Sequence, residues 1–308
     1  MINFRYHIVS LMAVFLALSV GIVLGVTLRG PVDEGLVTQA EQDRKQVQDL
    51  RTELDRRNAL DEYRDAWAQR TGKELTAGML TQRGVAIIAM PDAPTAVVND
   101  VSRAVTDAGG TVTHTVKVNK DAFDTTKAAA VSTATDPFAE QLQLTETMTS
   151  GSRLGLALGR AVLGKQTGER DALATELTEA LTGANLATID GKSTELAELA
   201  IVVTAEASEP RPDPEVLTAH VQMDVALRSV AAGVVLAGPN SDGIEGTDVL
   251  TARNNADSVD VLSTVDVADL TSGVATTVMA GKEQLLGRQG HYGALTKADA
   301  PLPLLPVR

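Results

Sequence analysis

His220, Met223 and Asp224 come closest, among the residues of this chain, to a metal-binding group. Positions i, i+3 and i+4 share one face of a helix, and an imidazole, a thioether and a carboxylate could bind copper together. The four histidines lie far apart in the sequence, and no His-Glu-x-x-His motif is present. The alternative is that Met223 packs in the core while His220 and Asp224 face solvent.

A second pattern has the spacing of a phosphate-binding P-loop. Gly159, Gly164 and Lys165 match its glycines and lysine, but Gln166 stands where a Ser or Thr would bind magnesium. The residues between the two glycines favour a helix, and no apolar strand precedes them. The chain also has no G-x-G-x-x-G motif after its first apolar run and no G-x-S-x-G motif. We therefore expect no catalytic residues, no resident cofactor and no enzyme activity.

Polar side chains follow two of the apolar runs that read as strands. Ligands of open parallel sheets bind in the crevice beyond the carboxyl ends of the strands, where these side chains would lie. Acidic loops and Asn-Ser-Asp-Gly turns are also common for backbone reasons alone, so this alternative stays open. The possible ligand crevice comprises Asp92, Asn240, Ser241 and Asp242.

The crevice depends on a sheet that the apolar pattern predicts. Residues 84–90 read as a buried strand, a helix follows over 95–108, and residues 111–119 alternate as a second strand. Such a βαβ unit calls for a parallel pair with a right-handed crossover. Later apolar runs at 199–204 and 233–238 continue the alternation. The predicted fold class is therefore α/β, an open α/β sandwich with a mostly parallel sheet.

We expect this globular domain to cover residues 82–293. Within it, residues 128–183 read as helices that interrupt the alternation, so they are predicted to form a helical insertion. Residues 294–308 contain several prolines and are expected to form a C-terminal tail.

An apolar stretch without charge precedes the domain. At about 1.5 Å per residue, residues 8–28 are long enough to cross a hydrocarbon core of about 30 Å. A cleaved signal peptide has a shorter apolar core of about 7 to 15 residues, so we predict a retained anchor. Arg5 precedes the span, while Arg29 is soon followed by two acids. This favours residues 1–7 in the cytoplasm and an extracytoplasmic C-terminal domain, hence a single-pass protein of the cell membrane.

Small residues recur at every fourth position within the apolar stretch. They would form one ridge along the helix, and such ridges let two membrane helices approach closely. Alanine and glycine are also simply common in membrane helices, which is the alternative. The predicted dimer face of the membrane helix consists of Ala13, Ala17, Gly21 and Gly25.

We expect Gly30-Pro31 to end or kink the membrane helix and a polar helix to begin near Asp33. Residues 33–71 are dense in charged side chains and carry an apolar seam too narrow to stabilise a lone helix. The pattern predicts a coiled-coil stalk, and a parallel homodimer is the simplest partner choice. The stalk could instead pack on its own domain or on another protein's coiled coil. The seam consists of Val37, Ala40, Val47, Leu50, Leu54, Leu60, Tyr63 and Trp67.

Charge is distributed unevenly along the chain. The formal net charge is −13, yet residues 1–32 hold Arg5, Arg29 and no acid. Phosphate backbones would repel so acidic an outer part, and the sequence has no basic stripe with interleaved aromatics, so we exclude nucleic acid as a partner. Because the chain has no cysteine, disulfides, thiolate metal sites and cysteine nucleophiles are excluded as well.

A glycine-rich loop with a cation, an imidazole and a phenol follows the last predicted helix. It contains Arg288, His291 and Tyr292 between Gly287 and Gly293. It is a possible docking loop, or it simply caps the domain.

Three segments of the chain resemble the actinobacterial MctB family: residues 1–10 with the span after them, residues 263–266 and residues 290–293. Their order matches the family along nearly the full chain. The resemblance implies two competing functions. One is copper export, for which the family is named and described as an outer-membrane channel. The other is cell separation, the role of the corynebacterial member SteB, which works with the membrane-associated protein SteA.

A channel would need several apolar helices or many strands with a lipid-facing alternation, and neither pattern is visible. We therefore favour a dimeric, non-enzymatic envelope protein that positions or regulates partners in cell separation or cell-wall remodelling. A SteA-like protein and cell-wall hydrolase regulators are the partners that the resemblance implies. Copper homeostasis is the alternative, with copper as a ligand on family grounds only and the outer mycolate membrane as the alternative location. A third interpretation is an envelope enzyme or a small-ligand-binding domain.

Overall fold

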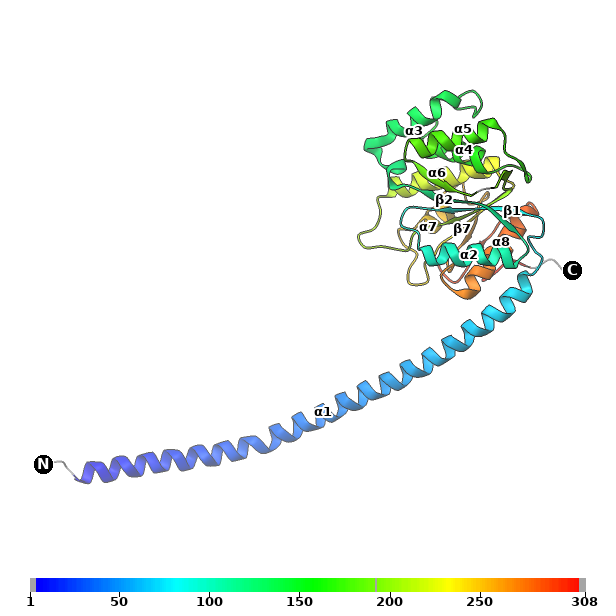
Figure 1. Ribbon diagram of the computed structural model, residues 1–308. Helices are drawn as coiled ribbons and strands as arrows, with labels where there is room; N and C mark the ends of the chain where they lie inside the picture. The colour runs from blue at the N-terminus through cyan, green and yellow to red at the C-terminus, as the bar shows by residue number, and fades with distance from the viewer. Residues whose placement is uncertain (1–3, 192, 305–308) are drawn as a thin grey trace. The chain divides into compact units, whose positions relative to one another are not determined.

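The computed structural model describes the backbone of residues 4–191 and 193–304, and the side chains of these residues apart from 4–6 and 28–38. The chain divides into two compact units, Met1–Arg64 and Asp65–Arg308. Helix α1 begins at Phe4 and ends at Thr76 (Figure 1). The first unit contains most of this helix, and the last turns of the helix belong to the second unit. The second unit holds every other helix and strand of the described residues.

Helix α1 does not end at Gly30-Pro31, where we expected one helix to give way to another. The residues on both sides of this dipeptide are helical, so the two predicted helices are one. Proline removes one backbone donor, but a long helix keeps the hydrogen bonds on either side of that position.

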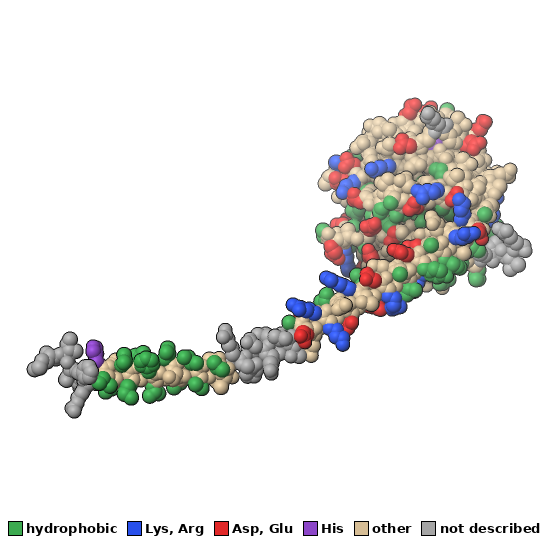
Figure 2. Space-filling view, turned by 60° about the horizontal axis from the view of Figure 1, so that its bottom comes forward, with side chains coloured by type: hydrophobic (Ala, Val, Ile, Leu, Met, Phe, Trp, Pro, Cys, Tyr) green, Lys and Arg blue, Asp and Glu red, His purple; other side chains and the backbone are tan. Residues whose placement is uncertain are grey.

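One segment of α1, His7–Thr27, is long and apolar enough to cross a membrane. None of its side chains is buried, and hydrophobic groups surround it on the visible face (Figure 2). Its two hydroxyls with described hydrogen bonds point back to its own backbone, because Ser19 donates to Phe15 O at 2.8 Å and Thr27 to Val23 O at 2.6 Å. A polar group satisfied within the helix does not need water, which suits a lipid environment.

The polar part of α1 leaves its apolar seam uncovered. Ion pairs within the helix join Glu53 to Arg56 and Arg57, so many of its charges are paired locally. The side chain of Val37, which was predicted to lie in the seam, is outside the described part of the chain. The coiled coil stays a prediction. The other seam side chains are exposed, namely Ala40, Val47, Leu50, Leu54, Leu60 and Tyr63 in the first unit and Trp67 in the second.

The second unit is built on a seven-stranded sheet in the order β4-β2-β1-β6-β7-β8-β9. All neighbouring strands are parallel except β2 and β4, which confirms the predicted α/β class with a mostly parallel sheet. The strands are β1 Gly84–Ala89, β2 Thr111–Val118, β4 Ala187–Asp190, β6 Leu199–Val203, β7 Gly233–Ala237, β8 Ser263–Val265 and β9 His291–Tyr292, with β3 Gly168–Glu169 and β5 Glu195–Leu196 in a separate antiparallel pair.

Helices cover both faces of the sheet (Figure 1). Successive side chains of a strand point to opposite faces, so Ala86 and Ile88 of β1 enter one core while Val85 and Ile87 enter the other. The first core contains side chains of α4, α5 and α6, and the second contains side chains of α2 and α8. The helices are α2 Thr95–Asp107, α3 Ala128–Thr135, α4 Ser150–Val162, α5 Ala172–Gly183, α6 Pro214–Val230, α7 Asp248–Asn254 and α8 Thr271–Leu285.

Helices α4 and α6 pack with backbone almost against backbone. Gly151 and Gly155 of α4 face α6, and a Cβ atom at either position would lie 2.3 Å from a carbonyl oxygen, that of Ala219 or Met223. Gly159, the first glycine of the pattern with P-loop spacing, continues this ridge one turn later against Val230. The glycines therefore serve helix packing, and the segment around Gly159 is helical rather than a phosphate cradle.

We predict that Gly155→Ala lowers the free energy of unfolding by about 1–3 kcal/mol, because the added methyl group forces α4 away from α6. Denaturant unfolding of the full chain in detergent, followed by circular dichroism, measures this. Gly183→Ala in α5 is the matched control, since a Cβ atom there meets nothing within 4 Å. Equal stability of the two variants would contradict the packing role of Gly155.

Candidate functional site

The strand order reverses between β1 and β6. From β1 the chain proceeds to β2 on one side, whereas β6, on the other side of β1, leads on to β7. In doubly wound folds such a switch point leaves a crevice outside the carboxyl ends of the strands, where ligands bind. A cleft of about 760 Å³ opens there, within the usual range of ligand pockets. Its walls come from the loops after β1, β2, β6 and β7 and from the first turns of α6.

Of the four residues predicted at the crevice, only Asp92 lines this cleft. Its carboxylate lies 3.3 Å from the Lys120 ammonium, and both side chains are well exposed. Asn240 is buried, and neither its Nδ2 nor its Oδ1 has a hydrogen-bond partner among the described residues. Ser241 donates a hydrogen bond to Asp269, and Asp242 is exposed to solvent. The segment after β7 thus lines the cleft through residues 246–248 and not through the three residues predicted there.

A buried His–Asp pair forms part of the cleft wall. His220 Nδ1 lies 2.8 Å from Asp248 Oδ1, and the two residues are only 8% and 4% exposed. The His220 ring also stacks edge-on with Phe123 at a centroid distance of 4.1 Å. When the imidazole is neutral and Asp248 is ionised, the proton lies on Nδ1 and Nε2 is an acceptor, whereas an imidazolium would donate from both nitrogens. His220 Nε2 has no partner among the described residues and is not among their fully enclosed polar atoms.

Asp224 lies one helical turn beyond His220 and is completely buried. Neither of its carboxylate oxygens has a hydrogen-bond partner among the described residues. Burial, and then the charge of Asp248, raise the pKa of Asp224 well above its ordinary value. An unpartnered buried carboxyl is costly, and such groups in native proteins tend to mark a functional or hydrated site.

The three residues at i, i+3 and i+4 of α6 are all buried. Met223 packs in the core, as the alternative interpretation expected, but His220 and Asp224 are buried rather than facing solvent. Among the described residues, no group of three or more His, Asp or Glu side chains is placed to hold a metal ion. No sequence pattern indicated Asp248, which is separated from His220 by the rest of α6 and by β7.

The glycine-rich loop after α8 is built into the fold. His291 and Tyr292 form the edge strand β9 and are each 6% exposed. His291 Nδ1 lies 3.0 Å from Thr264 Oγ1 and its Nε2 lies 3.1 Å from Val259 O, while the Tyr292 hydroxyl donates to Glu283. Of the three side chains predicted for docking, only Arg288 is half exposed.

A buried ion pair fastens this loop to β8. Arg253 Nη1 lies 2.7 Å from Asp266 Oδ2, and both side chains are fully buried. Arg253 also donates to Tyr292 O at 2.9 Å, and Asp266 Oδ1 accepts from the Ala294 amide at 2.9 Å. Gly293 has φ +133, and a Cβ atom there would collide with the Asp266 carboxylate. The segments 263–266 and 290–293 are therefore two halves of one structural element.

The family described as "Copper transport outer membrane protein, MctB" matches residues 1–303 of this chain. The chain belongs to the MctB family. Proteins named "Copper transporter MctB" from Mycobacterium tuberculosis (strain ATCC 25618 / H37Rv) and Mycobacterium leprae (strain TN) are each 30% identical to it, over 95% of this chain and 96% of their own length. The resemblance that the sequence suggested is thereby confirmed.

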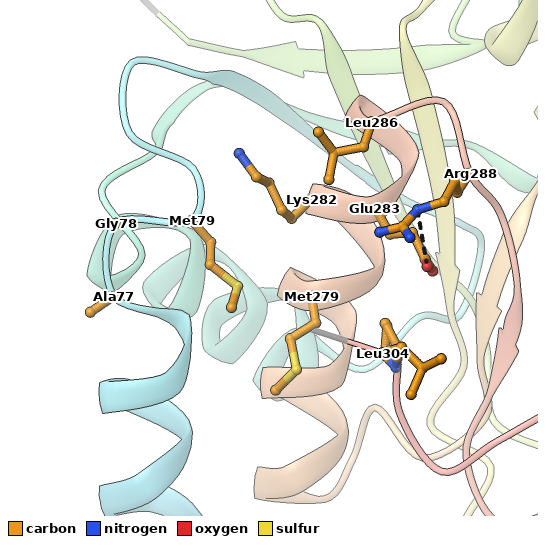
Figure 3. A pocket seen from close by; sticks show the side chains of 10 residues that line it. Ala77, Gly78, Met79, Met279, Lys282, Glu283, Leu286, Arg288 and Leu304 are labelled. Atoms are coloured by element: carbon orange, nitrogen blue, oxygen red, sulfur yellow. Dashed lines mark ion pairs between the residues drawn. The ribbon is translucent and has the colours of Figure 1, made fainter. Parts of the chain in front are cut away.

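A second cavity of this MctB chain, of about 200 Å³, carries the side chains best suited to soft copper(I). Met79, just after α1, and Met279 of α8 both line it (Figure 3). The Arg288 guanidinium there is 3.7 Å from Glu283, and the Lys282 ammonium lines the same cavity. Two thioethers fit copper(I), whereas the neighbouring cations oppose the binding of a bare metal ion.

We predict that Arg253→Ala lowers the free energy of unfolding of this MctB chain by about 3–5 kcal/mol, because it leaves Asp266 buried without its counter-charge. Denaturant unfolding monitors the loss. The control is Arg103→Ala, which breaks an exposed pair with Asp100 at 3.2 Å and should cost less than about 1 kcal/mol. A loss of similar small size in both variants would show that the buried pair does not fasten the loop.

Proposed function

We propose that this MctB-family chain is a single-pass envelope protein without enzyme activity, which holds an extracytoplasmic α/β domain at the membrane and positions or regulates partners there. The observation that carries the proposal is α1. It has an apolar segment with every side chain exposed, and it continues as a polar helix whose apolar seam is exposed too.

The apolar segment His7–Thr27 is the part of the described chain suited to lipid. The seven-stranded sheet has helices on both faces, so its strands bury their side chains in protein cores. Transport by such a chain would need several copies around one pore, because a single helix encloses no channel.

A second copy of the chain is the partner that best fits the seam of α1. Leu50 and Leu54 are 61% and 57% exposed, which is costly for an isolated helix in water. The seam is too narrow to stabilise a lone helix, and in a parallel pair each residue would meet its own counterpart. Pairing of the small residues at Ala17, Gly21 and Gly25 in the membrane would continue the same contact.

Because the chain has no cysteine, single cysteines report this pairing cleanly. We predict that Leu54→Cys cross-links two copies under mild oxidation, since seam positions of a parallel coiled coil face each other. Non-reducing electrophoresis of membranes detects the product. Thr52→Cys lies on the opposite side of the helix and serves as the control. Failure of both variants to cross-link, or equal cross-linking of both, would remove the homodimer from the proposal.

The proposed process is cell separation or cell-wall remodelling with a SteA-like partner and cell-wall hydrolase regulators. Copper homeostasis is the second candidate. It is favoured by the name of the mycobacterial relatives and by the two methionines, Met79 and Met279, that line one cavity.

A deletion strain distinguishes the two processes. We predict chained, unseparated cells that recover when the chain is supplied with an unrelated single-span anchor in place of residues 8–28. Microscopy scores separation, and growth on copper scores tolerance. Unchanged copper tolerance in the deletion strain would leave cell separation as the process.

Copper sensitivity that only the native membrane helix repairs would overturn the positioning role and favour transport. The variant Met79→Leu with Met279→Leu tests the cavity in the same strain, because Met and Leu have similar volumes and the fold should tolerate the exchange. Loss of copper tolerance with normal separation would assign the thioethers to copper.

A further inference from the structure

The cleft at the β1–β6 switch point has a strong excess of negative charge. Six carboxylates line it against a single ammonium, that of Lys120. Lys120 is itself 3.3 Å from Asp92, so it is already engaged by one of the six. Glu206 and Glu215 are exposed at the rim, and neither forms an ion pair with a described residue.

Two parts of the backbone around the cleft are unfavourable for anions, the usual ligands of such crevices. Anions bind there through free N–H groups of the first loop and of helix N-termini. The loop after β1 contains Pro91 and Pro94, which have no N–H group to offer. At the N-terminus of α6, the Asp213 side chain accepts from the Glu215 amide at 2.9 Å. A phosphate would therefore meet carboxylates where it needs donors.

With His220 neutral, the buried part of the wall presents two free acceptors. His220 Nε2 is an acceptor in the tautomer that donates Nδ1–H to Asp248, and the second oxygen of Asp248 has no hydrogen bond to a described residue. His220 is more than nine-tenths buried and lines the cleft. Unpaired acceptors at the floor require donors from the ligand, because leaving them unpaired is costly.

Apolar surface lies beside these acceptors. Phe123 and Leu217 line the same cleft and are almost completely buried. A ligand that combines N–H donors and positive charge with a short hydrocarbon body would match both features. Ammonium groups have three donors and no acceptor, so they complement this wall better than hydroxyls, which bring lone pairs of their own.

We propose that this cleft binds a small organic cation with primary amine groups, one ammonium donating to His220 Nε2 and Asp248 and another lying among Glu206 and Glu215 at the rim. This goes beyond the proposed function, because it concerns a ligand of the domain rather than its anchoring, pairing or cellular process.

Isothermal titration of the full chain in detergent with three four-carbon probes tests the proposal. Putrescine has an ammonium at each end, butanediol is its neutral counterpart, and succinate is its anionic counterpart. We expect saturable binding of putrescine alone, weakened several-fold as salt is raised, because the rim contacts are exposed.

Variants locate the binding. Glu206→Gln with Glu215→Gln removes two exposed charges without touching the core, and should weaken putrescine about threefold or more. His220→Ala should weaken it at least about tenfold by removing the buried acceptor. Glu179→Gln, an exposed acid of α5, is the control and should bind as the parent chain does. Circular dichroism checks each variant, and the rim variant stays informative if His220→Ala unfolds.

Binding of succinate or inorganic phosphate in the cleft would overturn the proposal, as would the absence of putrescine binding at millimolar concentration. Putrescine binding unchanged by the rim variant would mark an adventitious contact of an acidic surface and would also overturn it. None of these outcomes bears on cross-linking of α1 or on the phenotypes of the deletion strain.

Discussion

A parallel sheet buries both of its faces, and that requirement organises the second unit of this chain. Alternate residues of β1 enter two separate cores, so helices must cover the sheet from both sides. Covered faces leave only the ends of the strands open to solvent. The strand order reverses between β1 and β6, so the loops at the carboxyl ends of these strands run in opposite directions and leave a cleft between them. The position of the cleft therefore follows from the topology and not from particular side chains.

Two close contacts hold this arrangement. Glycines of α4 let α6 approach at the level of the backbone, and α6 in turn presents His220 to the cleft. At the β9 edge of the sheet, Arg253 and Asp266 join β8 to the loop of β9, which satisfies two buried charges with backbone groups as well as with each other. Residues 263–266 and 290–293, two of the segments that carry the family resemblance, thus serve the fold, while the cleft is formed by residues outside them.

The hydrophobic periodicity of the sequence predicted the buried strands and the fold class. The runs of Val, Ile and Ala in β1, β6 and β7 identified buried parallel strands, and the βαβ order identified the fold class. The edge strand β9 escaped notice because two residues carry no period, and its His291 and Tyr292 looked like exposed recognition groups. The crevice was predicted at the right end of the sheet through Asp92, but the pairing of His220 with Asp248 depends on how α6 turns toward the loop before α7. No local sequence pattern determines the orientation of α6 relative to that loop.

The backbone contact between α4 and α6 has a kinetic consequence. Glycine ridges leave no compressible side chains between two helices, so α6 cannot tilt or slide without moving α4 and the core behind it. One wall of the cleft is therefore stiff. Any adjustment to an entering molecule falls to the opposite loops, after β1 and β6, which have few buried groups. For the proposed amine, entry and release would then depend on the speed of those loops, and selectivity on the fixed geometry of α6.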